Sequence, residues 1–393
     1  MPLSRLPRVP RLLKRRPVPA SGDFSWDYDE YVPGNSLTLY VRGKELYPAM
    51  MAAIEKAEAS VHLETYIFGS DHTGRAFAEA LAKKARTGVR VRLIYDSIGS
   101  IDLDPTLETL MRNAGVQVLE YHPVAPWRPR WAWNRRDHRK ILVCDGRVAF
   151  VGGMNLNDEN APADIGGGDW RDAHVRVEGP AARELDLLFR EVWSAQTGRW
   201  FETAGDGATH GLARAKVAAN QEVLNRFVIR EAYVNALTAA REQVSIANAY
   251  FIPDWRIRRA LARAARRGVD VRVMVPGRSD SSAVWHAMRA RYDSLLTRGV
   301  RIFEWQGPMM HAKAVVVDKL WASVGTYNLD HRSLQHNLEV NLNVLDRAFA
   351  GELASQFELG LKGSREITLA DWRRRPLLER IKERLWVSFD YFF

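Results

Sequence analysis

The 393-residue sequence predicts an α/β protein of two pseudo-symmetric lobes, each a mixed sheet flanked by helices. Three observations support this prediction. The chain is long enough for two hydrophobic cores, the order strand, helix, strand occurs twice, and the same polar motif follows each occurrence. Because each lobe carries one copy of the motif, we expect the active site at the interface between the lobes.

Composition is typical of a folded soluble protein, with 46% hydrophobic and 26% charged residues, and it excludes a wholly disordered chain. The formal net charge of +10 favours an anionic partner, either nucleic acid, anionic lipid or a phosphorylated metabolite, although it equally suits a solubilising surface. The single cysteine, Cys144, excludes an intramolecular disulfide and is expected in the core. No apolar run reaches the ~18–20 residues that cross a bilayer, so any membrane contact is expected at the surface.

Two strand–helix–strand units form the repeat, and each helix ends at a glycine, Gly88 or Gly268. The first unit covers 61–68, 76–88 and 89–96, and the second covers 244–253, 258–268 and 269–276. A second helical pattern, 106–114 or 283–298, then leads into a short strand, 116–122 or 300–305, and into a hairpin that begins with histidine.

This order divides the chain into five parts. They are a basic N-terminal arm (1–34), lobe 1 (35–203), a linker (204–219), lobe 2 (220–365) and a basic, aromatic, amphipathic tail (366–393). The segment 204–219 is assigned as a linker because it is rich in small residues and weakly patterned.

The two hairpins share one motif, H-x-K-x4-D-x6-G-x2-N, beginning at residues 138 and 311. Its candidate site residues are His138, Lys140, Asp145 and Asn155 in the first copy, and His311, Lys313, Asp318 and Asn328 in the second. One H-x-K is common by chance, but two copies that match at this many fixed positions indicate two halves of one site.

Strand geometry places the motif residues relative to one another. Residues two apart face the same side of a strand, so each histidine points with its lysine. A turn at Asp145-Gly146 brings Gly153 roughly opposite His138, and the second turn brings Thr326 near His311. The motif aspartates lie ~16 Å farther along the strand, which favours a structural role at the turn although they remain in the candidate set.

The paired motifs suit a reaction on a phosphodiester. Two lysines and two asparagines can surround its oxygens and stabilise charge in the transition state. One neutral imidazole can attack phosphorus while the other, protonated, donates to the leaving oxygen, which gives a double displacement through a phosphohistidine. This chemistry requires no cofactor, and the sequence holds no HExxH, CxxC or carboxylate cluster for a metal.

These residues resemble the phospholipase D superfamily, whose paired HxKx4D hairpins match here over nearly the whole chain. The resemblance implies that His138 is the nucleophile and His311 the acid and base; the residues alone leave this open. It also implies a carboxylate from the opposite half for each histidine, Asp172 for His311 and Glu339 for His138. The alternative for either carboxylate is an ordinary surface position on a strand.

Within the superfamily the chain resembles bacterial cardiolipin synthases of the shorter type without N-terminal membrane spans. The resembling stretches are LETYIF, HRKILVCDGRVAFVGGMN, IANAYFIP, RRALARAARRGV and VGTYNLDHRSLQHNLEVNL. This implies transfer of a phosphatidyl group from one phospholipid to phosphatidylglycerol, with no nucleic acid partner; oligomeric state stays open. The competing hypotheses are a phosphodiesterase that hydrolyses lipid or nucleic acid, and a non-catalytic binding module, which two intact half-sites disfavour.

Three segments could meet a membrane, which would place the protein peripherally on the cytoplasmic face of the cell membrane. Residues 121–138 mix tryptophan with arginine, which suits lipid headgroups, stacking on nucleic acid bases or a packed loop. Residues 371–393 suit an interfacial amphipathic helix or a helix docked on a lobe. The basic arm attracts anionic lipid or is a solvated tail.

Overall fold

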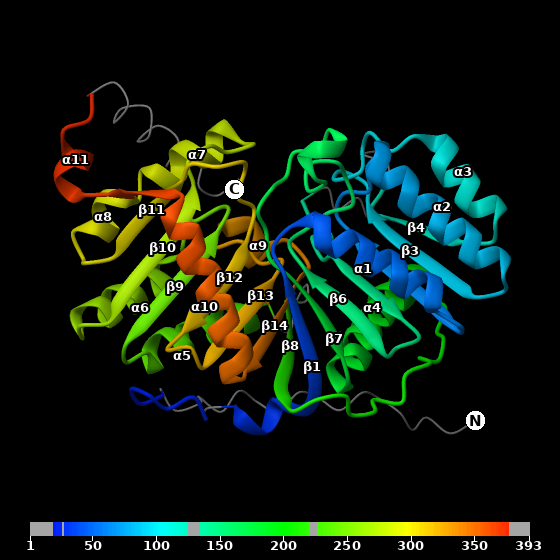
Figure 1. Ribbon diagram of the computed structural model, residues 1–393, viewed down its shortest axis with the longest axis horizontal. Coiled ribbons are helices and arrows are strands. Elements are labelled where there is room, and N and C mark those ends of the chain that lie inside the picture. The colour runs from blue at the N-terminus through cyan, green and yellow to red at the C-terminus, as the bar shows by residue number, and fades with distance from the viewer. Residues whose placement is uncertain (1–18, 26, 125–133, 221–225, 377–393) are drawn as a thin grey trace.

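The computed structural model describes residues 19–25, 27–124, 134–220 and 226–376, and shows two α/β halves joined by one continuous sheet (Figure 1). The sheet has fifteen strands in the order β15-β11-β10-β9-β12-β13-β14-β8-β1-β7-β6-β5-β2-β3-β4. The sheet is mixed: β2 pairs with β3 in parallel and with β5 antiparallel. The predicted α/β class with two related halves is therefore confirmed.

The elements of the first half run from the N-terminal strand to a long helix. They are β1 (Val32–Tyr40), α1 (Gly43–Lys56), β2 (Ser60–Thr65), α2 (His72–Arg86), β3 (Arg90–Asp96), α3 (Pro105–Asn113), β4 (Gln117–Tyr121), β5 (Ile141–Cys144), β6 (Val148–Gly152), β7 (His174–Glu178) and α4 (Pro180–Thr197). Short 3₁₀ helices lie at Tyr28–Glu30 and Ala163–Ile165.

The second half repeats this order. Its elements are β8 (Ala213–Asn220), α5 (Val228–Ala239), β9 (Gln243–Asn248), α6 (Trp255–Arg266), β10 (Asp270–Pro276), α7 (Ser282–Arg289), α8 (Tyr292–Leu296), β11 (Arg301–Trp305), β12 (Lys313–Val317), β13 (Trp321–Gly325), α9 (His331–Gln335), β14 (Glu339–Leu345) and α10 (Arg347–Lys362). Strand β15 (Ser364–Ile367) and helix α11 (Leu369–Arg373) follow.

Local signals explain where the repeated helices begin and end. The side chain of Asp71 accepts the amide of Gly74 at the start of α2, and Asp254 accepts the amide of Ile257 at the start of α6. After each helix a glycine adopts φ of +89°, a backbone conformation that disfavours other residues. The two strand–helix–strand units thus have the predicted form.

The two half-sheets also pack against each other. Strand β6 contacts β13 and β14, and β7 contacts β13, although none of these pairs are neighbours in the sheet. Valines from both halves meet in the core between them, including Val151, Val175 and Val324, all buried. The interface between the halves is therefore a hydrophobic core, and it lies directly beside the polar motifs.

The segment expected to be a linker contains a strand. Residues 213–219 belong to β8, which pairs along its whole length with β14 and also touches β1. Strand β8 corresponds to β1, since each pairs with the last strand of its own half. Its sequence, ARAKVAAN, holds a single β-branched residue, Val217, so the strand pattern is weak, and its alanines Ala215 and Ala218 are buried.

The hairpin register also differs by one residue from the expectation. Ile141 pairs with Val151 and Cys144 with Val148, so three residues form the first loop instead of two. Positive φ at Asp145 (54°) and Gly146 (62°) confirms the turn itself. The second hairpin has the same loop, with Asp318 and Lys319 at positive φ.

Much of the three expected membrane contacts lies outside the described residues: 1–18 of the arm, 125–133 of the tryptophan-arginine stretch and 377–393 of the tail. The described end of the arm packs on the second half, where Trp321 donates its indole N–H to Tyr31 at 2.8 Å. In the part of the chain that the structure describes, no helix is long and apolar enough to cross a membrane.

Candidate active site

Each motif histidine stands at the crossing of the two halves, just before the first strand of its hairpin. The amide of His138 donates to the carbonyl of Leu338 (3.0 Å), and the amide of His311 donates to the carbonyl of Arg171 (2.7 Å). These two bridges are related by the pseudo-symmetry. They fix each histidine to the residue that precedes the carboxylate of the other half.

Those carboxylates contact the imidazoles. The two oxygens of Glu339 lie 3.1 Å from Nδ1 of His138, and Oδ2 of Asp172 lies 3.0 Å from Nδ1 of His311. All four side chains are buried, with Glu339 fully inaccessible. A carboxylate on Nδ1 fixes the tautomer and leaves Nε2 for chemistry, as in other histidine-based sites.

The motif lysines lie beside their histidines. Nζ of Lys140 donates to the carbonyl of His138 (2.7 Å), and Nζ of Lys313 donates to the carbonyl of His311 (2.5 Å). Nζ of Lys313 also lies 2.9 Å from both ring nitrogens of His311. Burial lowers the pKa of Lys140 to about 7 and that of Lys313 to about 8.

The motif asparagines are buried near the same place. Oδ1 of Asn155 accepts the amide of Ile67 at 3.3 Å, and its carbonyl accepts the hydroxyl of Tyr47 at 2.7 Å. Oδ1 of Asn328 has no hydrogen-bond partner among the described residues. An unpaired buried amide oxygen is costly, which is consistent with a side chain kept for a ligand.

The motif aspartates bind backbone amides at the hairpin turns. The carboxylate of Asp145 accepts the amides of Glu58, Ala59 and Ser60 at 2.7–2.9 Å, at the start of β2. Asp318 accepts the three corresponding amides, Arg241, Glu242 and Gln243, at 2.8–2.9 Å before β9. Both carboxylates thus tie the hairpin loop to the neighbouring strand, and this geometry supports the structural role expected for them at the turns.

Three side chains that the motif does not reveal surround Glu339. Its oxygens accept the hydroxyls of Thr326 (2.5 Å) and Ser333 (2.7 Å) and the amide of Asn337 (3.3 Å). Thr326 therefore bonds the carboxylate of His138, and in the part of the chain that the structure describes it makes no hydrogen bond to His311, the histidine beside which it was expected. Only the folded arrangement of β13, α9 and β14 brings these donors together.

The position that corresponds to Thr326 in the first half is Gly153. A Cβ atom there would lie 2.2 Å from Oδ1 of Asp172, so any side chain would displace the carboxylate. Asp172 instead accepts the amide of Ala173 at 2.6 Å. The two half-sites thus share their backbone geometry but differ in how many donors hold the carboxylate.

Burial also sets the protonation of the histidines and of Glu339. The pKa of His138 falls well below its usual value, through burial and the charges of Lys140 and Lys313. The pKa of His311 is lowered by burial and by Lys313, but its hydrogen bond to Asp172 and the charge of Asp172 oppose this lowering. Burial raises the pKa of Glu339 to about 7, against the charge of Lys140.

A third buried histidine lies close behind the first half-site. His174 is 1% exposed, and neither ring nitrogen has a hydrogen-bond partner among the described residues. It lines a cavity of about 10 Å³ together with Lys140. The corresponding residue of the second half, Asn341, bonds Tyr233 and Ser323. No pattern in the sequence predicts this difference.

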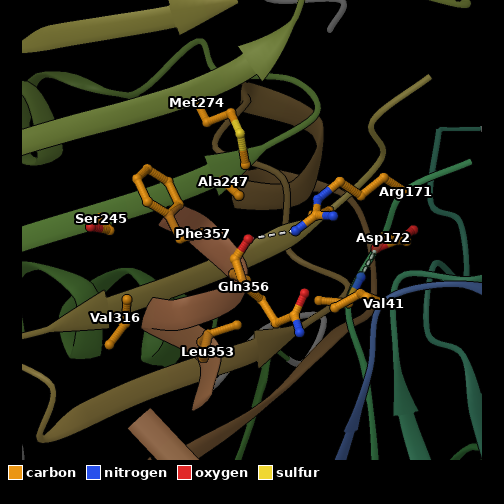
Figure 2. Close-up of a pocket in the computed structure, with 13 residues that line it drawn as sticks. Val41, Arg171, Asp172, Ser245, Ala247, Met274, Val316, Leu353, Gln356 and Phe357 are labelled. Carbon is orange, nitrogen blue, oxygen red and sulfur yellow. Dashed lines mark hydrogen bonds between the residues drawn. The ribbon is translucent and has the colours of Figure 1, made fainter. Parts of the chain in front are cut away.

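An apolar cavity of about 30 Å³ lies behind Asp172, lined mainly by small and apolar side chains of both halves (Figure 2). Arg171 donates to the carbonyl of Gln356 beside it (2.6 Å), and the amide of Asp172 donates to Val41 (3.1 Å). The cavity places mainly apolar side chains beside the Asp172 carboxylate.

No group of three or more His, Cys, Asp or Glu side chains suited to a metal ion occurs in the described ranges. Paired imidazoles, each with a carboxylate on one nitrogen and a lysine beside it, define instead a phosphodiester-transfer enzyme with a phospholipase D-like fold. The sequence model "Cardiolipin synthase, PLD-like domain" matches residues 50–193 and 233–359. The chain belongs to this family.

Curated relatives and solved structures agree with the assignment. A cardiolipin synthase of Alkalihalophilus pseudofirmus is 37% identical over 346 residues, which span 87% of this chain and 69% of that protein. A probable cardiolipin synthase of Bacillus subtilis is 33% identical, over 89% of this chain and 70% of the relative. The crystal structure of a phosphatidylserine synthase from Haemophilus influenzae has the same fold, with a TM-score of 0.67, 12% identity and coverage of 90% and 92%.

Proposed function

We propose that this chain is a cardiolipin synthase that moves a phosphatidyl group onto phosphatidylglycerol through a phosphohistidine. The observation that carries the proposal is the crossed pair of Nδ1–carboxylate contacts, Glu339 on His138 and Asp172 on His311. Each contact leaves an Nε2 atom available, so two imidazoles can act in sequence on one phosphorus.

In the first step Nε2 of His138 attacks phosphorus, and the bond from phosphorus to the head-group oxygen breaks. The imidazolium of His311 gives its proton to that oxygen, which leaves as an alcohol. In the second step neutral His311 takes the proton of the phosphatidylglycerol hydroxyl, the resulting oxygen attacks phosphorus, and the phosphorus–nitrogen bond breaks. Lys140 and Lys313 stabilise the negative charge on the phosphoryl oxygens.

The electrostatics support His138 as the nucleophile. A nucleophilic imidazole must be neutral, and the pKa of His138 lies well below its usual value. A general acid must hold a proton, and Asp172 favours the protonated form of His311. Glu339 is a weaker stabiliser of positive charge because it already accepts three side-chain donors.

The assay for this function uses purified protein, phosphatidylglycerol vesicles and EDTA. We expect cardiolipin and glycerol in equal amounts. Phosphatidic acid as the sole lipid product, or cleavage of DNA in place of lipid, would support the competing phosphodiesterase. His138→Ala and His311→Ala should each abolish turnover, and near-normal activity of either variant would rule out the two-histidine mechanism.

A substrate with an activated head group separates the two histidines. With phosphatidyl-p-nitrophenol, the leaving group needs no proton, so His311→Ala should still release a burst of about one p-nitrophenolate per enzyme molecule. His138→Ala should give no burst. The opposite pattern would exchange the two roles.

The substrates of the proposed reaction are phosphatidylglycerol and a second phospholipid, both in a membrane. We therefore infer a peripheral position on the cytoplasmic face of the cell membrane, which the net charge of +10 supports by attraction to anionic lipid. Cell fractionation tests this: the protein should sediment with membranes and leave them in high salt.

A further inference from the structure

The surroundings of His311 differ from those of His138 in one respect that concerns the head group. The rings of Trp170 and Tyr250 flank the His311 imidazole, with centroids at 5.7 Å and 6.2 Å. The hydroxyl of Tyr250 donates to Oδ2 of Asp280 at 2.6 Å. Asp280 lies in the loop between β10 and α7 and is exposed, so its carboxylate borders the site from the solvent side.

The charge of Asp280 acts on the second half-site. It raises the pKa of His311 and of Lys313, against the larger effect of burial. It also raises the pKa of Glu159, which comes from the loop after β6 in the first half. Asp280 therefore lies close enough to a carboxylate of the opposite half for the two charges to act on each other.

Among the residues that the structure describes, no exposed carboxylate accepts a hydrogen bond from the corresponding tyrosine of the first half-site, Tyr66. Tyr66 flanks His138 at 5.0 Å, and the acids whose charges raise its pKa are Asp96 and Glu339, both buried. Asp96 is fully buried, and its oxygens accept the amides of Ile98, Gly99 and Asp137. Asp280 accepts only Tyr250 and the adjacent Ser279 hydroxyl among the described residues, so it keeps lone pairs for a ligand.

This asymmetry matches the roles of the two imidazoles. In the proposed reaction His138 meets phosphorus, whereas His311 meets an alcohol in both steps. A carboxylate repels the phosphodiester anion, so Asp280 is unsuited to bind phosphate. It is well suited to accept a hydrogen bond from a hydroxyl group of the alcohol, and such charge-assisted bonds are strong.

We propose that Asp280, held by Tyr250 beside His311, binds the second hydroxyl of a vicinal diol and so selects a glycerol head group as acceptor. The first hydroxyl faces Nε2 of His311 and attacks phosphorus, while its neighbour donates to Asp280. Water and simple alcohols lack the second donor and gain nothing from Asp280. The inference rests on the proposed function, because it concerns the acceptor of that reaction.

A competition between soluble alcohols tests the inference without requiring a lipid acceptor. Enzyme, a phosphatidyl donor and equal concentrations of glycerol and 1-propanol give phosphatidylglycerol and phosphatidylpropanol, whose ratio measures selection. We expect Asp280→Asn to lower this ratio about tenfold, the effect of losing one hydrogen bond to a charged group. Tyr250→Phe should lower it less, because it frees the carboxylate without removing it.

Two controls separate selection from general damage. The burst with phosphatidyl-p-nitrophenol depends on the first step alone and should change less than threefold in Asp280→Asn. Asp293→Asn alters another exposed aspartate, paired with Arg373 on the far side of α8, and should leave the ratio unchanged. With 1,3-propanediol in place of glycerol, wild type and Asp280→Asn should behave alike, because that diol is not vicinal.

The outcomes distinguish this inference from the proposed function. An unchanged glycerol-to-propanol ratio in Asp280→Asn overturns the inference even if wild type makes cardiolipin. The same assay can be run with ethanolamine as the acceptor. If Asp280→Asn loses transfer to ethanolamine while the glycerol-to-propanol ratio is unchanged, the inference is also overturned, and Asp280 binds an ammonium group instead. A wild type that transfers to glycerol but makes no cardiolipin overturns the proposed function alone, and one that transfers to no alcohol overturns both.

Discussion

Removal of the Asp145 carboxylate tests whether the aspartate of the motif acts in chemistry or in folding. It accepts three amides, of which those of Ala59 and Ser60 are partly buried and that of Glu58 is exposed. Two bonds to a charged acceptor at ~1.5 kcal/mol each, with little from the exposed one, give a loss of about 3 kcal/mol for Asp145→Ala. The rate constant per folded molecule should stay within a few-fold of wild type.

Urea unfolding followed by tryptophan fluorescence measures the first quantity, and initial rates at low temperature measure the second. Asp318→Ala provides the comparison in the second half: its three amide bonds are of similar length, but only the one from Gln243 is partly buried, so the same estimate gives a loss of about 1.5 kcal/mol. Asp145→Asn should lose less, since one oxygen remains. A variant that keeps wild-type stability but loses turnover would refute this reasoning and return the aspartate to the catalytic set.

Three further predictions concern the buried charges. The kcat/KM profile should be bell-shaped: activity falls as pH drops through the Glu339 pKa of about 7, since that carboxylate must be ionised. It falls as pH rises because His311, whose pKa lies below its usual value, must be protonated in the first step, and because Lys140, with a pKa of about 7, must be charged. Thr326→Val removes one donor from Glu339, so its pKa should rise and the acid limb should move to higher pH. Gly153→Ala places a Cβ atom 2.2 Å from the Asp172 carboxylate and should lower kcat about a hundredfold or more with the fold intact by circular dichroism; a normal kcat would mean that Asp172 does not position His311.

The sequence predicted those parts of the molecule that depend on local pattern or on an internal repeat. Period-two and helical patterns located the strand–helix–strand units, and two matched motifs located both histidines and lysines. The partners Asp172 and Glu339 came from family resemblance, and the structure brings each to its expected histidine. No pattern in one chain could have paired residues 201 and 139 positions apart.

The missed features depend on packing in three dimensions. Strand β8 was read as a linker because alanine at Ala215 and Ala218 gives no strand signal, yet both are fully buried and β8 pairs with β14. The donors to Glu339 come from the residue after β13, from α9 and from the loop before β14, and Ser333 and Asn337 resemble any polar surface residue in sequence. Asp280 is an ordinary loop aspartate until Tyr250 and His311 are seen beside it.

Because each half supplies the carboxylate for the histidine of the other half, catalysis requires both halves together. Half of the chain, even if folded, would hold a histidine without its partner acid, and would be inert by construction. Two separately expressed pieces divided within residues 199–212, between α4 and β8, should regain activity only when they reassemble. For the same reason, a first piece with a substitution at Asp172 should restore no activity to an intact second piece. The lost carboxylate is the partner of His311, which belongs to the second piece.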